Sequence, residues 1–267
     1  MPRPFVKWVG GKSQLIKRYS SLLPKTWARY YEPFVGGGAM YFHFKPERAV
    51  LNDVNLELAN AYTVVRDRVD ELIEALHTHV YDKDHYYGIR DQSPEDLPEV
   101  DRAARTIFLN RTGFNGLYRV NKKGLFNVPF GRYTDPTICD ERNLRACSEL
   151  LQGVEFRSAD FERAIRDAQR GDFIYLDPPY APVSPTSDFT AYAAGGFDFN
   201  DQLRLRDTLV KLGRRGVQFM LSNSDAVGLR ALYEKQGWDV QRVRASRSIN
   251  SKSSRRGKVY ELVVRNY

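Results

Sequence analysis

The sequence predicts an α/β fold with a mostly parallel sheet. Strand-like apolar runs alternate with helical patterns in both end regions, and a glycine-rich or acidic turn follows several runs. This alternation is typical of a parallel sheet covered by helices, with ligands at the carboxyl ends of strands. A polar stretch rich in Gly, Asn and Arg interrupts the pattern over residues 67–149. We therefore expect a sheet domain from residues 1–66 and 150–267, with 67–149 inserted as a second domain.

Each expected element follows from the spacing of its apolar residues. Runs with the composition of strands end at turn residues, and helical segments repeat apolar residues every three or four positions. The expected strands are 30–34, 48–51, 154–157, 173–176, 217–221, 240–243 and 259–264. The expected helices are 12–23, 38–44, 56–65, 161–168, 202–212 and 226–236.

Composition limits the class of protein. Hydrophobic residues make up 42% of the chain and charged residues 28%, which is ordinary for a soluble globular protein. No apolar segment is long enough to span a membrane, and the N-terminus lacks the pattern of a signal peptide, so we expect a cytoplasmic protein. The two cysteines and four histidines form no ligand cluster, and we expect no metal.

The formal net charge is +8. Such an excess favours a polyanionic partner, because each phosphate that is neutralised releases condensed counterions. A generic basic surface explains the charge equally well when it is considered alone. Two segments concentrate the cations: Arg102, Arg105, Arg111, Arg119, Lys122, Lys123 and Arg132 in the middle, and Arg242, Arg244, Arg247, Lys252, Arg255, Arg256 and Lys258 near the C-terminus.

A glycine run, Gly36, Gly37 and Gly38, joins an expected strand to an expected helix in EPFVGGGAM. Glycine lets the backbone approach a ligand closely, and a helix N-terminus favours an anion. A dinucleotide fingerprint requires another glycine where Tyr41 stands, so NAD and FAD are disfavoured. A simple helix-capping turn is the alternative.

Asp53 ends the next expected strand, in VLNDVN. Its distance from the glycines approaches the spacing of roughly 20 residues at which an acid reaches ribose hydroxyls. The alternative for an isolated aspartate is a helix N-cap. Together the two motifs favour a nucleoside cofactor without a pyrophosphate.

The N-terminal stretch FVKWVGGKSQL supplies a third motif. Lys12 opens the expected helix behind two glycines, so its ammonium and the backbone amides can hold an anion, and Trp8 can cover an apolar or cationic group. The stretch is not a P-loop, because position 6 is valine. An N-terminal helix packed by Trp8 is an equally good interpretation of this motif alone.

The stretch YLDPPY predicts a clamp for a base. An adenine amine is a poor nucleophile because its lone pair is delocalised, and Asp177 and the Pro178 carbonyl can accept hydrogen bonds from both of its N–H groups. Pro178 and Pro179 fix the backbone and remove competing donors. Tyr180 offers a ring on which a flipped base stacks. We expect the amine to lose a proton only after a methyl group has been transferred to it, because the neutral amine is too weak an acid to be deprotonated by Asp177. A rigid turn is the alternative.

These motifs, in this order, resemble the Dam-type DNA adenine methyltransferases, in which the cofactor motif precedes the recognition domain and the catalytic motif follows it. The resemblance extends over nearly the whole chain: KWVGGK, EPFVGGG, LNDVN, NRTGFNGLYRVNKKGLFNVPFGRY, YLDPPYAPVSPTSDFTAY, LSNSD and RSINS. It implies a Rossmann-like sheet of the methyltransferase type with an inserted, mainly helical DNA-recognition domain containing a β-hairpin. It also implies S-adenosyl-L-methionine as the cofactor. The implied cofactor residues are Trp8, Lys12, Phe34, Gly36, Gly38, Asp53, Asp160, Phe161 and Asp177.

The same resemblance implies that the middle motif reads duplex DNA, commonly at GATC, in a protein that we expect to be monomeric in solution. Arg119 is the candidate for a bidentate contact to guanine. Phe114 and Asn115 are the candidates for filling the gap left by a flipped adenine. The other implied base-reading positions are Lys7, Leu117, Pro129 and Tyr133. A plain β-hairpin over NKKGLF is the structural interpretation of this stretch, and both can hold together.

Arg247, Ser248, Asn250 and Ser251 are the candidate phosphate contacts, which fix register without reading sequence. A solvated basic loop is the alternative. Two other functions remain open at this point: a methyltransferase acting on rRNA guanine or protein glutamine, which the long basic insertion disfavours, and a DNA-binding protein that has lost catalysis. The intact Lys12, Asp53, Asp177 and Tyr180 argue against that loss.

Overall fold

The computed structural model describes residues 2–12, 15–179, 197–246 and 258–267. The chain forms two compact units. The first unit contains Met1–Ser13, Val35–Lys45 and Asp53–Ser158, and the second unit contains Gln14–Phe34, Pro46–Asn52 and Ala159–Tyr267. This division differs from the expected boundaries at 67 and 149, because residues 53–66 pack with the helices that follow them. The functional boundaries of a recognition domain stay a prediction.

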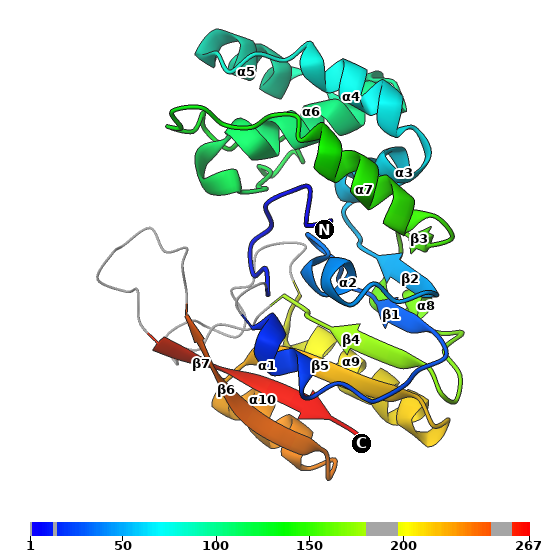
Figure 1. The fold of residues 1–267 in the computed structure, drawn as a ribbon. Coiled ribbons are helices and arrows are strands. Elements are labelled where there is room, and N and C mark those ends of the chain that lie inside the picture. The colour runs from blue at the N-terminus through cyan, green and yellow to red at the C-terminus, as the bar shows by residue number, and fades with distance from the viewer. Residues whose placement is uncertain (1, 13–14, 180–196, 247–257) are drawn as a thin grey trace. The chain divides into compact units, whose positions relative to one another are not determined.

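In the described part of the chain, seven strands form one sheet in the order β3-β2-β1-β4-β5-β7-β6 (Figure 1). β1 pairs in parallel with β2 and β4, and β4 pairs in parallel with β5, whereas β7 is antiparallel to both β5 and β6. The prediction of a mostly parallel α/β sheet is therefore confirmed. The bounds are β1 Tyr30–Glu32, β2 Ala49–Asn52, β3 Glu155–Arg157, β4 Phe173–Leu176, β5 Gln218–Ser224, β6 Asp239–Ser246 and β7 Lys258–Arg265.

The second unit has its core along β4 and β5. Every residue of β4 is buried, as expected for a central parallel strand covered on both faces. Apolar residues of α9 and α10 pack in the same core, among them Leu205, Leu209 and Leu229. The helices of this unit are α1 Ile16–Ser20, α8 Phe161–Ala164, α9 Phe199–Arg214 and α10 Val227–Glu234.

The first unit is mainly helical. α6 is its central element, with ten buried residues, and it packs against α3, α4 and α5. Because α6 is contacted from several sides, its buried residues extend around most of the helix and leave no extended polar face. The helices are α2 Ala39–Phe44, α3 Leu56–Asp67, α4 Val69–His77, α5 Lys83–Asp91, α6 Glu99–Thr112 and α7 Glu141–Leu151, with 3-10 turns at Pro94–Asp96 and Phe114–Gly116.

Two expected helices are shorter than predicted. The helix expected at 12–23 is reduced to α1, and Lys12 precedes it, so the prediction that Lys12 opens this helix is wrong. The Gly11 N–H donates to the Trp8 carbonyl at 3.2 Å, and Gly10 has a φ of 84°, so a turn replaces the helical start. The helix expected at 161–168 ends with Ala164, since the next residue, Ile165, leaves helical geometry.

The expected hairpin is a chain reversal without regular strands in the described part of the segment. An isolated bridge joins Val120 and Phe126, and on either side of it the Asn127 N–H donates to the Arg119 carbonyl at 3.0 Å and the Asn121 N–H to the Leu125 carbonyl at 2.8 Å. Asn121 Oδ1 accepts hydrogen bonds from the backbone N–H groups of Lys123 and Leu125, and Gly124 has a φ of 78°. The Asn121 side chain thus satisfies backbone donors that a strand ladder would otherwise pair.

Candidate functional site

The glycine turn and Asp53 are joined in the first unit. The Gly36 N–H donates to Asp53 Oδ2 at 3.1 Å, and the Asn55 N–H donates to Oδ1 at 3.0 Å. The N-cap of α3 is Asn55, whose side chain accepts from the Leu58 N–H, so the N-cap alternative for Asp53 is wrong. Burial raises the pKa of the Asp53 carboxyl above its usual value, and the two backbone hydrogen bonds partly offset this shift.

Two positions of the glycine run require the absence of a side chain. A Cβ on Gly36 would lie 2.6 Å from Trp8 Cδ1, and one on Gly38 would lie 2.5 Å from Tyr62 Oη. Both glycines also have positive φ angles, 49° and 71°. The Trp8 ring therefore packs directly on the glycine turn, and the Tyr62 hydroxyl donates to the Gly36 carbonyl at 3.1 Å. These contacts bring Trp8, Gly36 and Asp53 together.

Lys12 belongs to the same unit. Its side chain is buried, and Nζ donates to the Gly10 carbonyl at 2.8 Å. A buried ammonium held by a turn carbonyl is a fixed positive charge, and such a group favours an anionic ligand. This placement changes the structural context of Lys12 from a helix to a turn, and the binding of an anion by its ammonium stays a prediction.

The acidic turn follows β4 in the second unit. Asp177 is half-buried, Pro178 is buried and Pro179 is exposed, while Tyr180 lies outside the described residues. The Ser222 hydroxyl donates to Asp177 Oδ1 at 3.2 Å. The carboxylate at the end of this central strand is thus held by the neighbouring strand β5.

Asp160 and Phe161 begin α8, and Phe34 lies beside them. The Phe34 and Phe161 rings are 5.7 Å apart, and Phe197 packs edge-on against Phe34 at 5.6 Å. Asp160 Oδ1 accepts from the Glu162 N–H at 3.0 Å and from Arg204 at 2.9 Å. The Arg204 guanidinium also lies 5.0 Å from the centre of the Phe161 ring.

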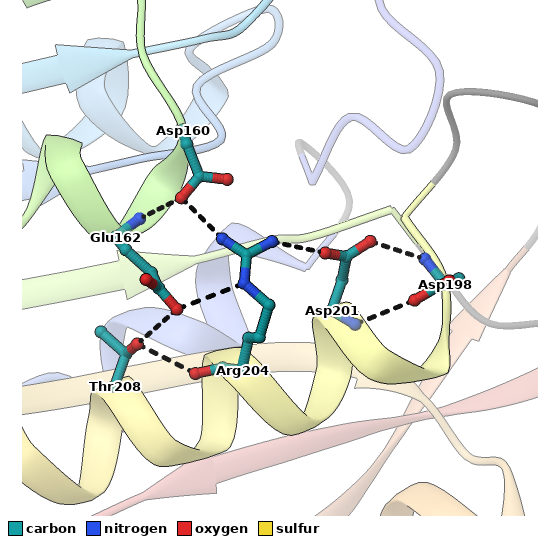
Figure 2. A network of polar contacts seen from close by, with 6 residues as sticks. All are labelled: Asp160, Glu162, Asp198, Asp201, Arg204 and Thr208. Carbon is teal, nitrogen blue, oxygen red and sulfur yellow. Dashed lines mark hydrogen bonds and ion pairs between the residues drawn. The ribbon is translucent and has the colours of Figure 1, made fainter.

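Figure 2 shows Arg204 of α9 pointing toward three carboxylates. Asp160 and Glu162 come from the start of α8, and Asp201 lies one helical turn before Arg204. Asp201 and Asp198 form a capping box at the start of α9. The network ties α8 to α9 and fixes the orientation of Asp160, which the sequence motifs had not indicated because Arg204 lies 44 residues away.

Two of the recognition candidates of the first unit, Lys7 and Tyr133, lie together, and Asn110 holds the Lys7 backbone. Its backbone N–H donates to Asn110 Oδ1 at 2.7 Å, and Asn110 Nδ2 donates back to the Lys7 carbonyl at 2.7 Å. Asn110 Nδ2 also donates to the Gly116 carbonyl at 3.0 Å. Lys7 Nζ lies 4.3 Å from the centre of the Tyr133 ring. One asparagine of α6 therefore joins the N-terminal stretch to the segment after α6.

Phe114, Asn115 and Pro129 present exposed surface in the same segment. Phe114 is 44% exposed, which is unusual for a large apolar side chain. Asn115 has a φ of 55°, and the Phe114 N–H donates to the Pro129 carbonyl at 2.9 Å. Leu117 is half-buried one turn further on. A rigid backbone thus carries an exposed ring.

Arg119 is exposed and supports the chain reversal. Nε donates to Asn127 Oδ1 at 2.7 Å, and Nη2 donates to the Asn127 carbonyl at 2.9 Å. These contacts hold the planar guanidinium in one orientation. The candidate phosphate contacts Arg247, Ser248, Asn250 and Ser251 lie outside the described residues.

Arg204 carries no recognisable sequence signal, whereas Asn110, Tyr118 and Ser222 lie inside the quoted motifs NRTGFNGLYRVNKKGLFNVPFGRY and LSNSD without a role having been predicted for them. Asn110, Arg204, Ser222 and Tyr118 act through partners that are distant in the chain or on another element. Tyr118 stacks on Trp8 with ring centres 5.3 Å apart. Its place within the middle motif, directly before Arg119, is the sequence signal for this residue.

Within the described ranges, no group of three or more His, Cys, Asp or Glu residues could hold a metal ion. None of the helices in these ranges has both the length and the apolar composition needed to cross a membrane.

A model of the D12 class N6 adenine-specific DNA methyltransferases matches residues 8–249 of the chain. The chain belongs to this family. It is 44% identical over 273 residues to the Type II methyltransferase M1.LlaDCHI of Lactococcus lactis subsp. cremoris, with 99% of this chain and 95% of that protein covered. It is 42% identical to the Type II methyltransferase M.MjaIII of Methanocaldococcus jannaschii, with 99% of each chain covered. It is 38% identical to the DNA adenine methylase of Vibrio cholerae, with coverages of 98% and 95%.

The methyltransferase is therefore an enzyme that acts on adenine in DNA. The substrate named for this family is adenine in DNA, which disfavours the alternative substrates left open by the sequence, an rRNA guanine and a protein glutamine. The resemblance to Dam-type enzymes is confirmed.

Proposed function

We propose that the methyltransferase transfers a methyl group from S-adenosyl-L-methionine to the exocyclic N6 amine of an adenine flipped out of duplex DNA, with GATC as the target and the cytoplasm as its location. The observation that carries this proposal is the fixed carboxylate of Asp177 at the end of β4, followed by a buried proline. A carboxylate held by Ser222 needs little reorganisation to accept a hydrogen bond from an incoming amine.

The residues of the first unit fit the cofactor. Asp53 offers a carboxylate to ribose hydroxyls, Lys12 a buried positive charge to the methionine carboxylate, and Trp8 a ring beside the glycine turn. The fit rests on the way these groups lie together, because the Gly36 N–H donates to Asp53 Oδ2 and the Trp8 ring packs directly on the glycine turn.

In the second unit, Phe34 and Phe161 offer apolar rings for an adenine, and Asp160 offers an acceptor for its amine. Arg204 orients this acceptor. When bound, the cofactor supplies an electrophilic methyl group on a sulfonium. The negative charge of Asp177 favours that positive centre.

Asp177 and the Pro178 carbonyl accept the two amine hydrogens of the target, which localises the nitrogen lone pair for attack. Pro179 and Tyr180 complete the clamp, with the Tyr180 ring stacking on the flipped base. As the new N–C bond forms, the bond between the methyl group and the sulfur of the cofactor would break and leave a neutral thioether, and the cationic nitrogen then releases one proton to water. No proton has to leave the neutral amine.

We assign recognition to residues 67–149 together with Lys7. Arg119 reads guanine, and Lys7, Leu117, Pro129 and Tyr133 complete the base-reading surface, while Phe114 and Asn115 fill the gap left by the flipped base. The support is the exposure of Phe114 and the fixed orientation of Arg119. Phosphate contacts fall to Arg247, Ser248, Asn250 and Ser251.

A labelled-methyl assay on duplex DNA tests the proposal. Asp177→Ala is expected to abolish transfer while the affinity for S-adenosyl-L-methionine falls only modestly. Asp207→Ala, which changes an exposed aspartate of the same unit, is the matched control and keeps full activity. Modified adenines mapped in DNA from cells expressing the protein identify the site. An active Asp177→Ala variant, or methylation outside GATC, would contradict the corresponding part of the proposal.

A further inference from the structure

Trp8 contacts both the glycine turn and the segment that carries Arg119. The pyrrole edge of its indole faces Gly36, where an added Cβ would lie 2.6 Å from Trp8 Cδ1 and 3.2 Å from Nε1. Tyr118 stacks on the same indole, with ring centres 5.3 Å apart and an angle of 27° between the planes. One side chain therefore joins the turn that we assign to the cofactor to the residue directly before Arg119.

Tyr118 also begins the chain reversal, residues 118–127. Its ring packs edge-on against Phe126 near the other end of the reversal, with ring centres 5.7 Å apart. Beside this ring pair, the Asn127 N–H donates to the Arg119 carbonyl at 3.0 Å. Residues 119–125 are all exposed. The two rings thus form the base of the reversal, and the part between them is in contact with solvent.

A cavity of about 280 Å³ lies beside the reversal. Its lining includes Asn55 and Glu57 at the start of α3 and Arg102 of α6, together with Val120 and Phe126 of the reversal. The reversal is therefore not closely packed against these two helices at this place. A segment with exposed residues and a cavity beside it has few contacts that restrict it, and such segments open locally at a low cost in free energy.

We propose that Tyr118 is a positioning residue that couples the cofactor site to base reading. The inference rests on the functions proposed for Trp8 and Arg119. Contact with the cofactor restricts the Trp8 indole, the indole restricts the stacked Tyr118 ring, and this ring orders the reversal that carries Arg119. Because one ligand has then ordered the segment that the other ligand needs, cofactor and DNA strengthen each other's binding by the same factor.

Calorimetric titration with S-adenosyl-L-homocysteine, which is the cofactor without its methyl group, measures this coupling without a reaction. In the wild-type protein, a GATC duplex is expected to raise the affinity for this compound about fivefold or more, and a duplex with a substituted guanine is expected to raise it less. In Tyr118→Ala, the affinities with and without the GATC duplex are expected to agree within about twofold. Tyr118→Phe retains the stacked ring and is expected to keep the wild-type coupling. Where the alanine variant does not fold, Tyr118→Leu retains most of the side-chain volume without the flat ring and carries the same expectation.

Hydrogen exchange of the backbone amides in residues 117–128 tests the ordering without DNA. S-adenosyl-L-homocysteine alone is expected to slow this exchange about threefold or more in the wild-type protein and in Tyr118→Phe, and to leave it unchanged in Tyr118→Ala. A residue that only stabilised the fold would alter exchange in the free protein and leave the response to the compound intact. The response therefore separates positioning from stability.

Tyr87→Ala is the matched control in the same unit. Tyr87 is half-buried like Tyr118 and packs edge-on against Tyr86, with ring centres 5.5 Å apart. This variant is expected to lose thermal stability much as Tyr118→Ala does and to keep the wild-type coupling and exchange response. A wild-type protein without coupling, coupling that survives in Tyr118→Ala, or coupling that is lost in Tyr118→Phe or Tyr87→Ala would overturn the inference. A wild-type protein that methylates no adenine in duplex DNA would instead overturn the proposed function.

Discussion

The Gly36 N–H donates to Asp53 Oδ2 at 3.1 Å, and this hydrogen bond joins the turn after β1 to the turn after β2. Two motifs that are 17 residues apart in the sequence thereby form one local structure. The carboxylate that we assign to the ribose is consequently part of the scaffold that shapes the glycine turn.

Acidification is expected to weaken the binding of S-adenosyl-L-methionine, because it protonates the Asp53 carboxylate. Since the pKa of Asp53 is raised, this loss of affinity begins at a higher pH than it would for an ordinary aspartate. The raised pKa means that the folded protein holds the Asp53 proton more tightly than the unfolded chain does. This carboxyl therefore favours folding at low pH, and its contribution is lost as the pH rises through the raised pKa. Cofactor binding requires the ionised Asp53 carboxylate, so the affinity for the cofactor rises as the pH rises through the raised pKa. Calorimetric titration across acidic and neutral pH measures both the affinity and its slope.

Asp53→Asn is expected to bind the cofactor weakly at every pH and to remove most of the slope. Asp91→Asn changes an exposed aspartate of the same unit and is expected to keep the wild-type profile. A wild-type affinity that does not change on acidification would contradict the role of Asp53.

Gly36→Ala is expected to prevent cofactor binding. The new Cβ would lie 2.6 Å from Trp8 Cδ1, so the tryptophan must move in addition to the cost of a positive φ. Tryptophan fluorescence and calorimetric titration report the two effects. Gly153→Ala is the control, since Gly153 also has a positive φ of 78° but has open space around it. Equal losses of binding in both variants would show that backbone strain alone is responsible.

Arg119→Ala is expected to lose discrimination at one base, worth about 1 to 3 kcal/mol. General DNA affinity is expected to fall less. Because Arg119 also supports the chain reversal through Asn127, Asn127→Ala is the matched variant that disturbs the support and retains the guanidinium. Methylation rates on a set of single-base-substituted duplexes separate the two. A uniform loss over all sequences in Arg119→Ala would refute the assignment of base reading.

Arg102→Ala is expected to lower the free energy of unfolding by about 2 to 3 kcal/mol, because it leaves the buried Glu57 carboxylate without its ionic partner. Arg102 Nε lies 2.9 and 3.1 Å from the two Glu57 oxygens, and the pair joins α6 to α3. The corresponding surface change is Arg68→Ala, which breaks an exposed pair with Glu71 and is expected to change stability little. Thermal and denaturant unfolding compare the variants. Equal stabilities would contradict the importance of the buried pair.

The sequence determined the class of fold and most of its elements. Short apolar runs such as 173–176 end at turn residues, and this local pattern is sufficient to place a strand. The glycine run, Asp53 and Asp177 were found for the same reason, since each follows an expected strand and ligands bind at that end of a parallel sheet. The order of the motifs along the chain then indicated the family.

Only the tertiary structure decided what each of these residues contacts. Helix α1 begins at Ile16 and not at Lys12, because the preceding residues form a turn in which the Gly11 N–H donates to the Trp8 carbonyl and Lys12 Nζ donates to the Gly10 carbonyl. The spacing of apolar residues does not predict these hydrogen bonds. Asp160 acquired Arg204 as a partner, and Asp177 acquired Ser222, across separations of 44 and 45 residues. Strand register and the packing of α9 bring these side chains together, and both depend on interactions of the whole unit. The spacing of apolar residues predicts where a strand ends. Which side chain contacts the residue at that end depends on which strand pairs with the first one, as Ser222 of β5 contacts Asp177 after β4.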